Sequence, residues 1–309
     1  MAFYPQALLL LLTRPCRFAS KQIDPSQKLP HLRAMTQSYL STMADVGVDS
    51  WIMHGTLLGW WWNQKIMPWD SDLDVQVSES ALYFLAEHYN MTQHEFRLDD
   101  GTTRRFLLEI NPNFVLRTKA DVDNVIDARW IDMSSGLFID ITSVRKDYEA
   151  RAKGDSGALM CKDWHRYQED DLFPLRDSFF EGIPVKIPYA YTKLLVEEYG
   201  EKALTETHFE YHDFDYESKE WIPMNEEDRK KEEQAKKEAE EKKKQEEEKK
   251  KQEEEKKKQE EEQKKKQEEE RKKQEEEKKK QDEQQKKSLQ EEAKKAQQQG
   301  QPQPSPLSN

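Results

Sequence analysis

The stretch HGTLLGWWWNQKIMPWDSDLDVQVS, residues 54–78, decides the fold because turn, helix and strand patterns follow one another in it. A short apolar strand, residues 51–53, leads into it, and residues 54–56 form a turn before an apolar segment that we expect to be helical. Pro68 breaks that segment, and residues 70–77 then alternate polar and apolar side chains with the period of a β-strand.

Acidic side chains recur along this last strand. Asp72 and Asp74 are two residues apart, so both point to one face, and Asp70 has the same parity one step further out. Two carboxylates held together repel unless a cation lies between them. Mg²⁺ is bound in proteins by one or two carboxylates together with substrate phosphates, so the spacing predicts a site for Mg²⁺ or Mn²⁺. An isolated Asp-x-Asp pair, by contrast, more often lies in a surface loop.

Two further features support the metal site. Gly55 and Thr56 follow one strand and precede a helix, a corner that can present backbone N–H groups to a phosphate. Asp140 is a lone charge in the apolar strand sequence of residues 137–142, and buried charges are rare unless they are paired or metal-bound. Together with Asp72 and Asp74, it would form a carboxylate cluster for metal-assisted phosphoryl chemistry.

Other side chains are candidates for smaller roles. The basic residues that could hold phosphates are Lys65, Arg104, Arg105 and Arg129. His208 and His212 have the i, i+4 spacing of a zinc pair, but a third ligand and the HExxH order are missing, so we expect no metal there. Residues 60–62 are three Trp that could stack on a sugar or a base, and at least one of them is expected in the core because three consecutive residues cannot share one helix face.

The composition divides the chain into two parts. Residues 226–300 contain 27 acidic and 27 basic residues and no aromatic residue, so residues 1–225 hold all eight Trp and the net charge of −12. The first part can bury a core, and the second cannot. The acidic first part argues against a nucleic-acid partner, and no apolar run approaches the ~20 residues of a membrane-spanning helix. Cys16 and Cys161 are expected to be two unrelated thiols.

Both ends of the chain are expected to lie outside the folded domain. Residues 1–20 include an apolar run without a preceding Lys or Arg, which fits a short, weak or truncated secretory signal or anchor and equally an ordinary N-terminal segment. Residues 301–309 are expected to be disordered from their Pro- and Gln-containing composition.

The remaining patterns indicate one mixed α/β domain over residues 21–225. Apolar spacing predicts helices over residues 31–46, 79–90 and 188–199. It predicts further strands over residues 105–110, 125–131, 137–144 and 182–187. Ser78 is placed to cap the second helix, and residues 146–163 have the composition of a polar loop. Helices and strands are mixed without strict alternation, which favours an α+β or mixed-sheet α/β fold class.

The tail repeats KKKQEEE with a seven-residue period. A coiled coil needs apolar residues at two positions of each heptad, and these are missing, so there is no seam to bury. The spacing instead places Glu and Lys at i, i+4, as for Glu246 and Lys250. We predict a single solvated helix over residues 226–300, about 110 Å long at 1.5 Å per residue. A partly helical low-complexity tail without a specific role is the alternative.

The block from HGTLLG to PWDSDLD resembles the signature of the LicD family, which includes bacterial phosphocholine transferases and the fukutin group. The segments GLFIDIT, DDLFPLRDSFFEGIPVKIP and YTKLLVEEYG follow that family's order more weakly, and the resemblance covers roughly residues 31–205. The three Trp, the WDSDLD motif and the Lys/Glu tail are most similar to the fungal branch, the regulators of mannosylphosphate transfer to cell-wall glycans.

This resemblance implies a nucleotidyltransferase-like domain that moves a phosphorylated group from a nucleotide-diphosphate donor to a sugar hydroxyl. It implies metal ligands and catalytic acids at Asp72, Asp74 and Asp140. Gly55 and Thr56 match the donor-phosphate corner, with Lys65 as a further donor-phosphate candidate. The donor is expected to be GDP-mannose, and the acceptor a mannose hydroxyl of mannan or of an N- or O-linked glycan. The resemblance also implies a place in the secretory pathway, at the Golgi membrane or in its lumen.

Three hypotheses follow for the function. The first is a transferase that uses Mg²⁺ or Mn²⁺, with Asp140 as a candidate base. The second is a regulator that binds nucleotide, glycan or a true transferase without turnover, with the charged tail as the docking arm for that transferase. The third is a structural protein built on the charged helix. We favour the first, because a protein that only binds has no need of paired metal ligands.

Overall fold

The computed structural model describes residues 23–98, 101–117 and 125–299. The chain forms two compact units, one that ends at Met224 and one that begins at Asn225. The expectations for residues 1–20 and 301–309, and for Cys16, lie outside the described residues. None of the helices in these ranges combines the length and the apolar character that crossing a membrane requires.

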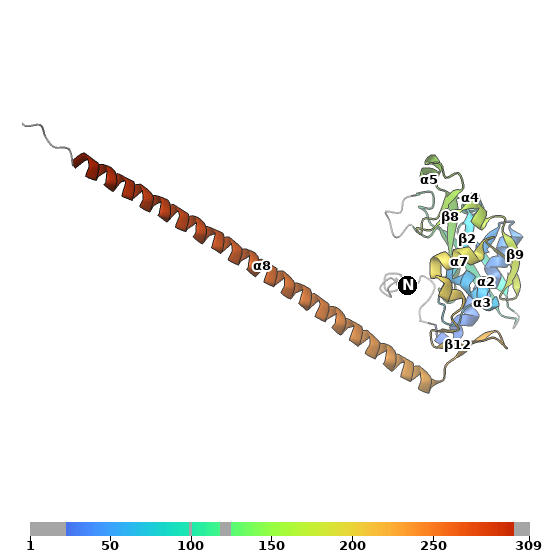
Figure 1. Ribbon diagram of the computed structural model, residues 1–309. Helices are drawn as coiled ribbons and strands as arrows, with labels where there is room; N and C mark the ends of the chain where they lie inside the picture. The colour runs from blue at the N-terminus through green and yellow to red at the C-terminus, as the bar shows by residue number, and fades with distance from the viewer. Residues whose placement is uncertain (1–22, 99–100, 118–124, 300–309) are drawn as a thin grey trace, which may run out of the picture. The chain divides into compact units, whose positions relative to one another are not determined.

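A curled mixed sheet forms the body of the first unit (Figure 1). Its strands are β1 (Ser50–Ile52), β2 (Leu73–Ser78), β3 (Gln93–Arg97), β4 (Thr103–Ile110), β5 (Ala128–Asp132), β6 (Phe138–Lys146), β7 (Ala158–Met160), β8 (Arg166–Gln168), β9 (Arg176–Phe180) and β10 (Ile183–Ile187). Their order is β3-β4-β5-β6-β2-β1-β10-β9, with β7 paired to β6 and β8 to β7. Both parallel and antiparallel pairs occur, so the predicted mixed α/β fold class is confirmed.

Helices pack on this sheet and lie before, between and after its strands along the chain. They are α2 (Pro25–Asp45), α3 (His54–Asn63), α4 (Glu79–His88), α5 (Tyr148–Ala152), α6 (Glu169–Leu172), α7 (Tyr191–Tyr199) and the 3₁₀ helix η2 (Glu201–Leu204). A small antiparallel sheet of β11 (His208–Phe209), β12 (His212–Asp215) and β13 (Glu220–Pro223) completes the unit. Ser78 caps α4 as predicted, because its Oγ accepts from the backbone N–H of Ala81 (3.1 Å).

The face of the sheet that α2 covers is fixed by side-chain pairing. Trp130 of β5 donates from Nε1 to Ser38 Oγ of α2 (3.0 Å), so it faces that helix. Trp130 lies opposite Ile139 of β6, which in turn pairs with Leu73 of β2. Paired residues share a face and successive residues alternate, so Leu73 points towards α2 and Asp74 points to the other face.

Five predicted features are wrong for identifiable reasons. The helix predicted over residues 31–46 begins at Pro25, where the side chain of Asp24 caps it by accepting from Ser26 N–H (2.9 Å). Residues 54–56 are not a turn, because α3 begins at His54 and Leu57 N–H already bonds Met53 C=O (3.2 Å). The strand predicted over residues 70–77 begins at Leu73, where the pairing with β6 begins.

The other two errors lie later in the chain. The helix predicted from Pro188 begins at Tyr191, since the N–H groups of Tyr189 and Ala190 bond carbonyls at Leu172 and Asp171 instead. Residues 146–163 are not a plain loop: they contain α5, capped by the side chain of Asp147, and β7.

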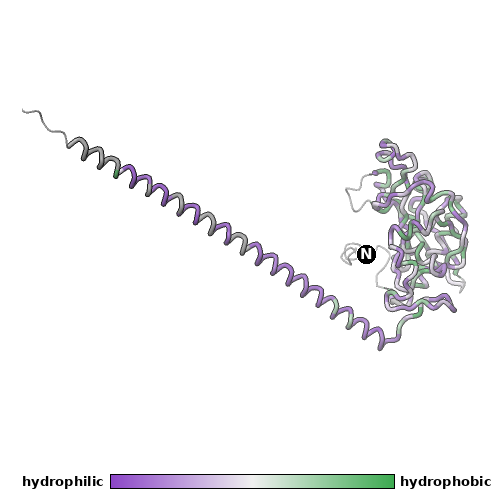
Figure 2. The backbone as a smooth tube through the Cα atoms, viewed as in Figure 1, coloured by the Kyte–Doolittle hydropathy of each residue, from purple (hydrophilic) through white to green (hydrophobic). Residues whose placement is uncertain are grey.

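The second unit contains the helix α8 (Glu226–Gln299) of 74 residues, as predicted for the charged repeat. Figure 2 shows its described residues to be almost entirely hydrophilic. Pairs at i, i+4 recur along it, such as Glu240 with Lys244 (2.9 Å) and Glu254 with Lys258 (2.9 Å). Exposed ion pairs of this kind, rather than burial of an apolar face, support the helix.

We expect Gly59→Ala to destabilise the first unit. A Cβ at Gly59 would lie 2.5 Å from the backbone oxygen of Lys65, so α3 or the chain after it must shift. Such overpacking costs about 1–3 kcal/mol, which lowers Tm by several degrees in thermal unfolding. Gly157→Ala is the matched control, because there the close atom (2.7 Å) is the amide oxygen of the flexible Gln168 side chain. Equal Tm values for the two variants would contradict this account of Gly59.

We also expect the helix content of a 226–300 fragment to be greatest near neutral pH. Hydrogen bonds from lysines lower the pKa of Glu240 and Glu254, and the same bonds raise the pKa of Lys244 and Lys258. The stabilisation from these glutamates is lost as pH falls through their folded pKa, and that from these lysines as pH rises through theirs. Far-UV circular dichroism should therefore lose helical signal below about pH 4 and above about pH 11. A signal independent of pH would show that the pairs contribute nothing.

Candidate functional site

Carboxylates gather on the face of the sheet opposite α2. The parallel pairing of β2 and β6 places Asp74 directly beside Asp140. Asp70 and Asp72 precede β2 in the turn after Trp69, where Asp70 N–H bonds Met67 C=O (2.9 Å). We call Asp70, Asp72, Asp74 and Asp140 the acidic cluster.

These carboxyls disfavour one another's charge. Burial raises the pKa of Asp74 to about 8; His54 opposes this rise, and the other members of the cluster add to it. Burial also raises the pKa of Asp70 to about 7, with a further rise from the charge of Asp72. The pKa of Asp140 is raised by burial as well, with a smaller rise from Asp72. The cluster therefore has more negative charge than its surroundings neutralise.

Two cationic side chains act on this cluster. Arg129 of β5 donates from Nε to Asp140 Oδ1 (2.8 Å), and it lowers the pKa of that carboxyl against the effect of burial. Burial lowers the pKa of Lys28, while the charges of Asp70 and Asp72 raise it, so Lys28 interacts with the outer part of the cluster. Because repulsion remains, oxygen ligands of this kind fit a hard divalent cation such as Mg²⁺.

The first turn of α3 lies against the acidic cluster. Thr56 Oγ1 accepts from the backbone N–H of Asp74 (2.9 Å), so its hydroxyl ties the start of α3 to β2. A Cβ on Gly55 would lie 3.5 Å from Asp70 Oδ2 and 3.9 Å from the hydroxyl of Tyr199. The predicted phosphate corner and the predicted metal ligands are therefore neighbours, and the positive end of the α3 dipole faces the acids.

The other predicted phosphate-holding cations lie elsewhere. Lys65 forms an ion pair with Glu220 and, with Arg104, lines a cavity of about 640 Å³. None of the acidic cluster lines this cavity. Arg104 pairs with Asp132 (3.3 Å), and Arg105 is exposed on β4. Of the four cations singled out from the sequence, Arg129 is thus the one that contacts the cluster.

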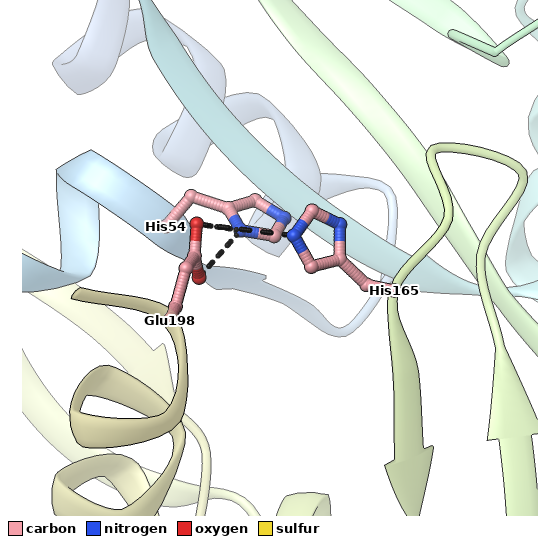
Figure 3. Close-up of side chains that lie close together, drawn as sticks. All are labelled: His54, His165 and Glu198. Carbon is pink, nitrogen blue, oxygen red and sulfur yellow. Dashed lines mark hydrogen bonds and ion pairs between the residues drawn. The ribbon is translucent and has the colours of Figure 1, made fainter. Parts of the chain in front are cut away.

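A second group of ionisable side chains adjoins the first, and Figure 3 shows three of its members, His54, His165 and Glu198. Its members are His54, Asp163, His165 and Glu198. His54 Nδ1 lies 2.9 Å and 3.0 Å from the two oxygens of Glu198, and the imidazole rings of His54 and His165 are 4.3 Å apart between centroids. In the described residues, His54, His165 and Glu198 form a group whose ligand atoms lie within 4.8 Å of one another.

Charge pairing holds this group together. Burial lowers the pKa of His54, but its close contacts with Asp163 and Glu198, with the nearby charge of Asp74, outweigh burial and raise the pKa to about 10. Burial raises the pKa of Asp163, but its close contacts with His165 (3.2 Å) and His54 (3.6 Å) outweigh burial and hold that pKa well below its usual range. Little in the sequence indicates this group: His54 adjoins the glycine corner, but His165 and Glu198 are distant in sequence and follow no recognisable spacing.

The remaining candidates have packing roles. His208 and His212 lie on neighbouring strands, where His208 pairs with Asp213 (2.8 Å), so their helical spacing is coincidental. Trp60 packs against Tyr191 (4.9 Å between centroids), Trp62 is half-buried, and Trp61 is 36% exposed. Cys161 is a buried free thiol.

Comparison with known proteins gives one family and two relatives. Residues 47–190 match the model for the LicD/FKTN/FKRP nucleotidyltransferase domain. The chain is 29% identical over 163 residues to Mannosyltransferase regulator 14 of Saccharomyces cerevisiae, covering 48% of this chain and 17% of that protein. It is 36% identical over 123 residues to Mannosyltransferase regulator 4 of the same yeast, covering 39% of this chain and 10% of that protein. The aligned region thus spans less than a fifth of either relative.

We expect Asp72→Asn to stabilise the metal-free protein at pH 8. The raised pKa values of Asp70 and Asp74 mean that their contribution to stability is full below about pH 4 and is lost as pH rises to about 8. Asp72→Asn removes a charge that repels both, so Tm at pH 8 should rise by about 2–4 °C, which corresponds to about 1 kcal/mol. Differential scanning fluorimetry in a chelator measures this change.

The same variant should respond less to Mg²⁺. Added Mg²⁺ should raise the Tm of the wild-type protein, because a ligand that binds the folded state stabilises it, and it should raise the Tm of Asp72→Asn less. Asp177→Asn, at an exposed carboxylate paired with Lys186, is the matched control and should behave as wild type. A destabilised Asp72→Asn with an unchanged Mg²⁺ response would contradict the assignment.

Proposed function

Residues 47–190 of this chain belong to the LicD/FKTN/FKRP nucleotidyltransferase-domain family, and we propose that the domain transfers a sugar-phosphate to a glycan hydroxyl. The family match and the two yeast relatives support the coarser conclusion of a role in mannosylphosphate transfer. The finer proposal is transfer of mannose-1-phosphate from GDP-mannose to a mannose hydroxyl of a cell-wall or glycoprotein glycan.

The observation that carries this proposal is the acidic cluster beside the first turn of α3. Asp74 and Asp140 are held on adjacent parallel strands, and Gly55 lies against Asp70. Asp72, Asp74 and Asp140 would hold Mg²⁺ or Mn²⁺, which when bound neutralises the donor diphosphate and the charge that develops on the leaving monophosphate. Backbone N–H groups at the start of α3 would orient the same phosphates.

The proposed reaction balances without a redox partner. The acceptor hydroxyl oxygen forms a bond to the phosphorus that carries mannose, and the bridging bond of the diphosphate breaks. GMP leaves with that bridging oxygen, and the acceptor proton passes to a base. One of the acids of the cluster would accept that proton, and Arg129 already occupies one oxygen of Asp140, the candidate base chosen from the sequence.

Donor, acceptor and location are proposed from the relatives. The two yeast proteins are named for regulation of a mannosyltransferase, which favours mannose on the donor and acceptor. Mannan and N- or O-linked glycans are elaborated in the secretory pathway, so we propose that the chain acts there, at the Golgi membrane or in its lumen.

A regulator without turnover is the second candidate function. The word "regulator" in both relatives' names favours it, and so does the ion pair that already occupies Asp140. In this case the domain binds nucleotide or glycan, and α8 serves as a docking arm for a transferase.

The test of the proposal is acceptor-dependent release of GMP. Full-length protein is incubated with Mn²⁺, GDP-mannose and a mannose oligosaccharide, and the GMP formed is quantified by chromatography. We expect the Asp72→Asn, Asp74→Asn double variant to lose at least 100-fold in rate, since it loses two of the three proposed metal ligands. The Asp177→Asn variant is the control for general damage.

The possible outcomes separate the two functions. GMP release that requires the acceptor and disappears in the double variant supports the transferase. Metal-dependent binding of GDP-mannose without GMP release favours the regulator. Equal GMP release by wild type and double variant would refute the role of the acidic cluster.

A further inference from the structure

We propose that His54, His165 and Glu198 form a binding site for a transition-metal ion, with Zn²⁺ as the fitting ion, separate from the acidic cluster. Their ligand atoms lie within 4.8 Å of one another. Two imidazoles and one carboxylate are a donor set that suits Zn²⁺, whereas the all-oxygen acidic cluster suits Mg²⁺ or Mn²⁺. This proposal does not depend on the reaction proposed above.

The donor atoms converge on one point, as Figure 3 shows. The carboxylate of Glu198 faces His54 Nδ1 at 2.9 Å and 3.0 Å, and its Oε1 lies 3.9 Å from His165 Nε2. These atoms are close enough for an ion to draw them together by small side-chain rotations.

Asp163 supplies the outer contacts that such a site needs. Its Oδ2 lies 3.6 Å from His54 Nε2, and its Oδ1 lies 3.2 Å from His165 Nδ1. Both nitrogens are buried without a hydrogen-bond partner, and both face this carboxylate. A small rotation of Asp163 would let it accept from the far nitrogen of each imidazole. That contact would fix the tautomer that leaves the near nitrogens, His54 Nδ1 and His165 Nε2, free to ligate.

The ligands are carried by well-anchored backbone. His54 is the first residue of α3 and is held at φ 55°, a conformation that side chains of this kind rarely adopt. His165 closes the turn between β7 and β8, where Cys161 N–H bonds His165 C=O (3.0 Å). Lys162 in the same turn is fully buried and pairs with Asp127 (2.8 Å). Glu198 lies in the last turn of α7.

The site has an approach from solvent. His54 is buried, His165 is half-buried and Glu198 is exposed, so the ligands run from the interior to the surface. Three protein ligands with solvent access leave a fourth position for water or a substrate oxygen, which is the pattern of catalytic rather than structural zinc sites.

The two sites are connected through adjacent residues. His54 directly precedes Gly55, and Glu198 directly precedes Tyr199, whose hydroxyl lies beside Gly55. An ion on His54 and Glu198 would therefore lock the start of α3 against the end of α7, next to the acidic cluster. The ion would thereby also hold Gly55 and Thr56 in place.

The test uses full-length protein loaded with Co²⁺ as a spectroscopic substitute for Zn²⁺. Absorption in the visible range and X-ray absorption at the metal edge report nitrogen ligands without any variant. The Asp72→Asn, Asp74→Asn background removes two proposed ligands of the acidic cluster, so imidazole-ligated Co²⁺ that persists there reports the proposed site. We expect Co²⁺ with imidazole ligands in both proteins, and a single equivalent in the double variant.

Variants then locate the site. His165→Gln should weaken Zn²⁺ binding at least 100-fold in competition with a chelator, and Asp163→Asn should weaken it about 10–100-fold as an outer contact. His208→Gln is the matched control, since His208 is an exposed histidine paired with Asp213. Circular dichroism checks that each variant is folded.

Two results would overturn the proposal. One is a wild-type spectrum with oxygen ligands alone, and the other is equal Zn²⁺ affinity of His165→Gln and His208→Gln. Loss of GMP release in the Asp72→Asn, Asp74→Asn background, with the Co²⁺ spectrum retained, would show that the two sites are independent.

Discussion

The parallel pairing of β2 with β6 is the constraint on which the candidate site depends. It runs from Leu73 with Ile139 to Ser78 with Val144, and it fixes both faces of the sheet at once. The apolar residues of this register face α2, so the alternate residues, including Asp74 and Asp140, must face the other side. A slip of one residue would bury the acids against α2 and expose the core.

This arrangement costs stability that the surrounding structure offsets. Four carboxylates that repel one another and a non-glycine residue at φ 55° are both unfavourable in a metal-free protein. Thr56 ties α3 to Asp74 by a hydrogen bond, and Gln76 of β2 donates to Tyr167 of β8 (3.0 Å). These contacts anchor the unfavourable groups on β2, a central strand of the sheet, and on the helix beside it.

The two ionisable clusters have complementary chemistry. The acidic cluster offers oxygen ligands and excess negative charge, whereas the group around His54 balances two imidazoles against two carboxylates. Both meet at the start of α3. The same short helix therefore brings backbone N–H groups and His54 next to the acidic cluster, so one stretch of sequence carries most of the candidate site residues.

The sequence by itself determined the division into an aromatic-rich domain and a charged helix, the mixed α/β class, and the juxtaposition of Asp74 with Asp140. These follow from local periodicity and from the rarity of a lone charge in an apolar strand, and both are properties of short segments. The tertiary structure alone decided where α7 begins, that Lys65 pairs with Glu220 rather than joining the acids, and that His165 and Glu198 meet His54. The reason is physical. The ion pair and the histidine group join residues more than a hundred positions apart, and the start of α7 depends on hydrogen bonds to the end of another helix. No local sequence pattern encodes the path of the chain that brings these residues together.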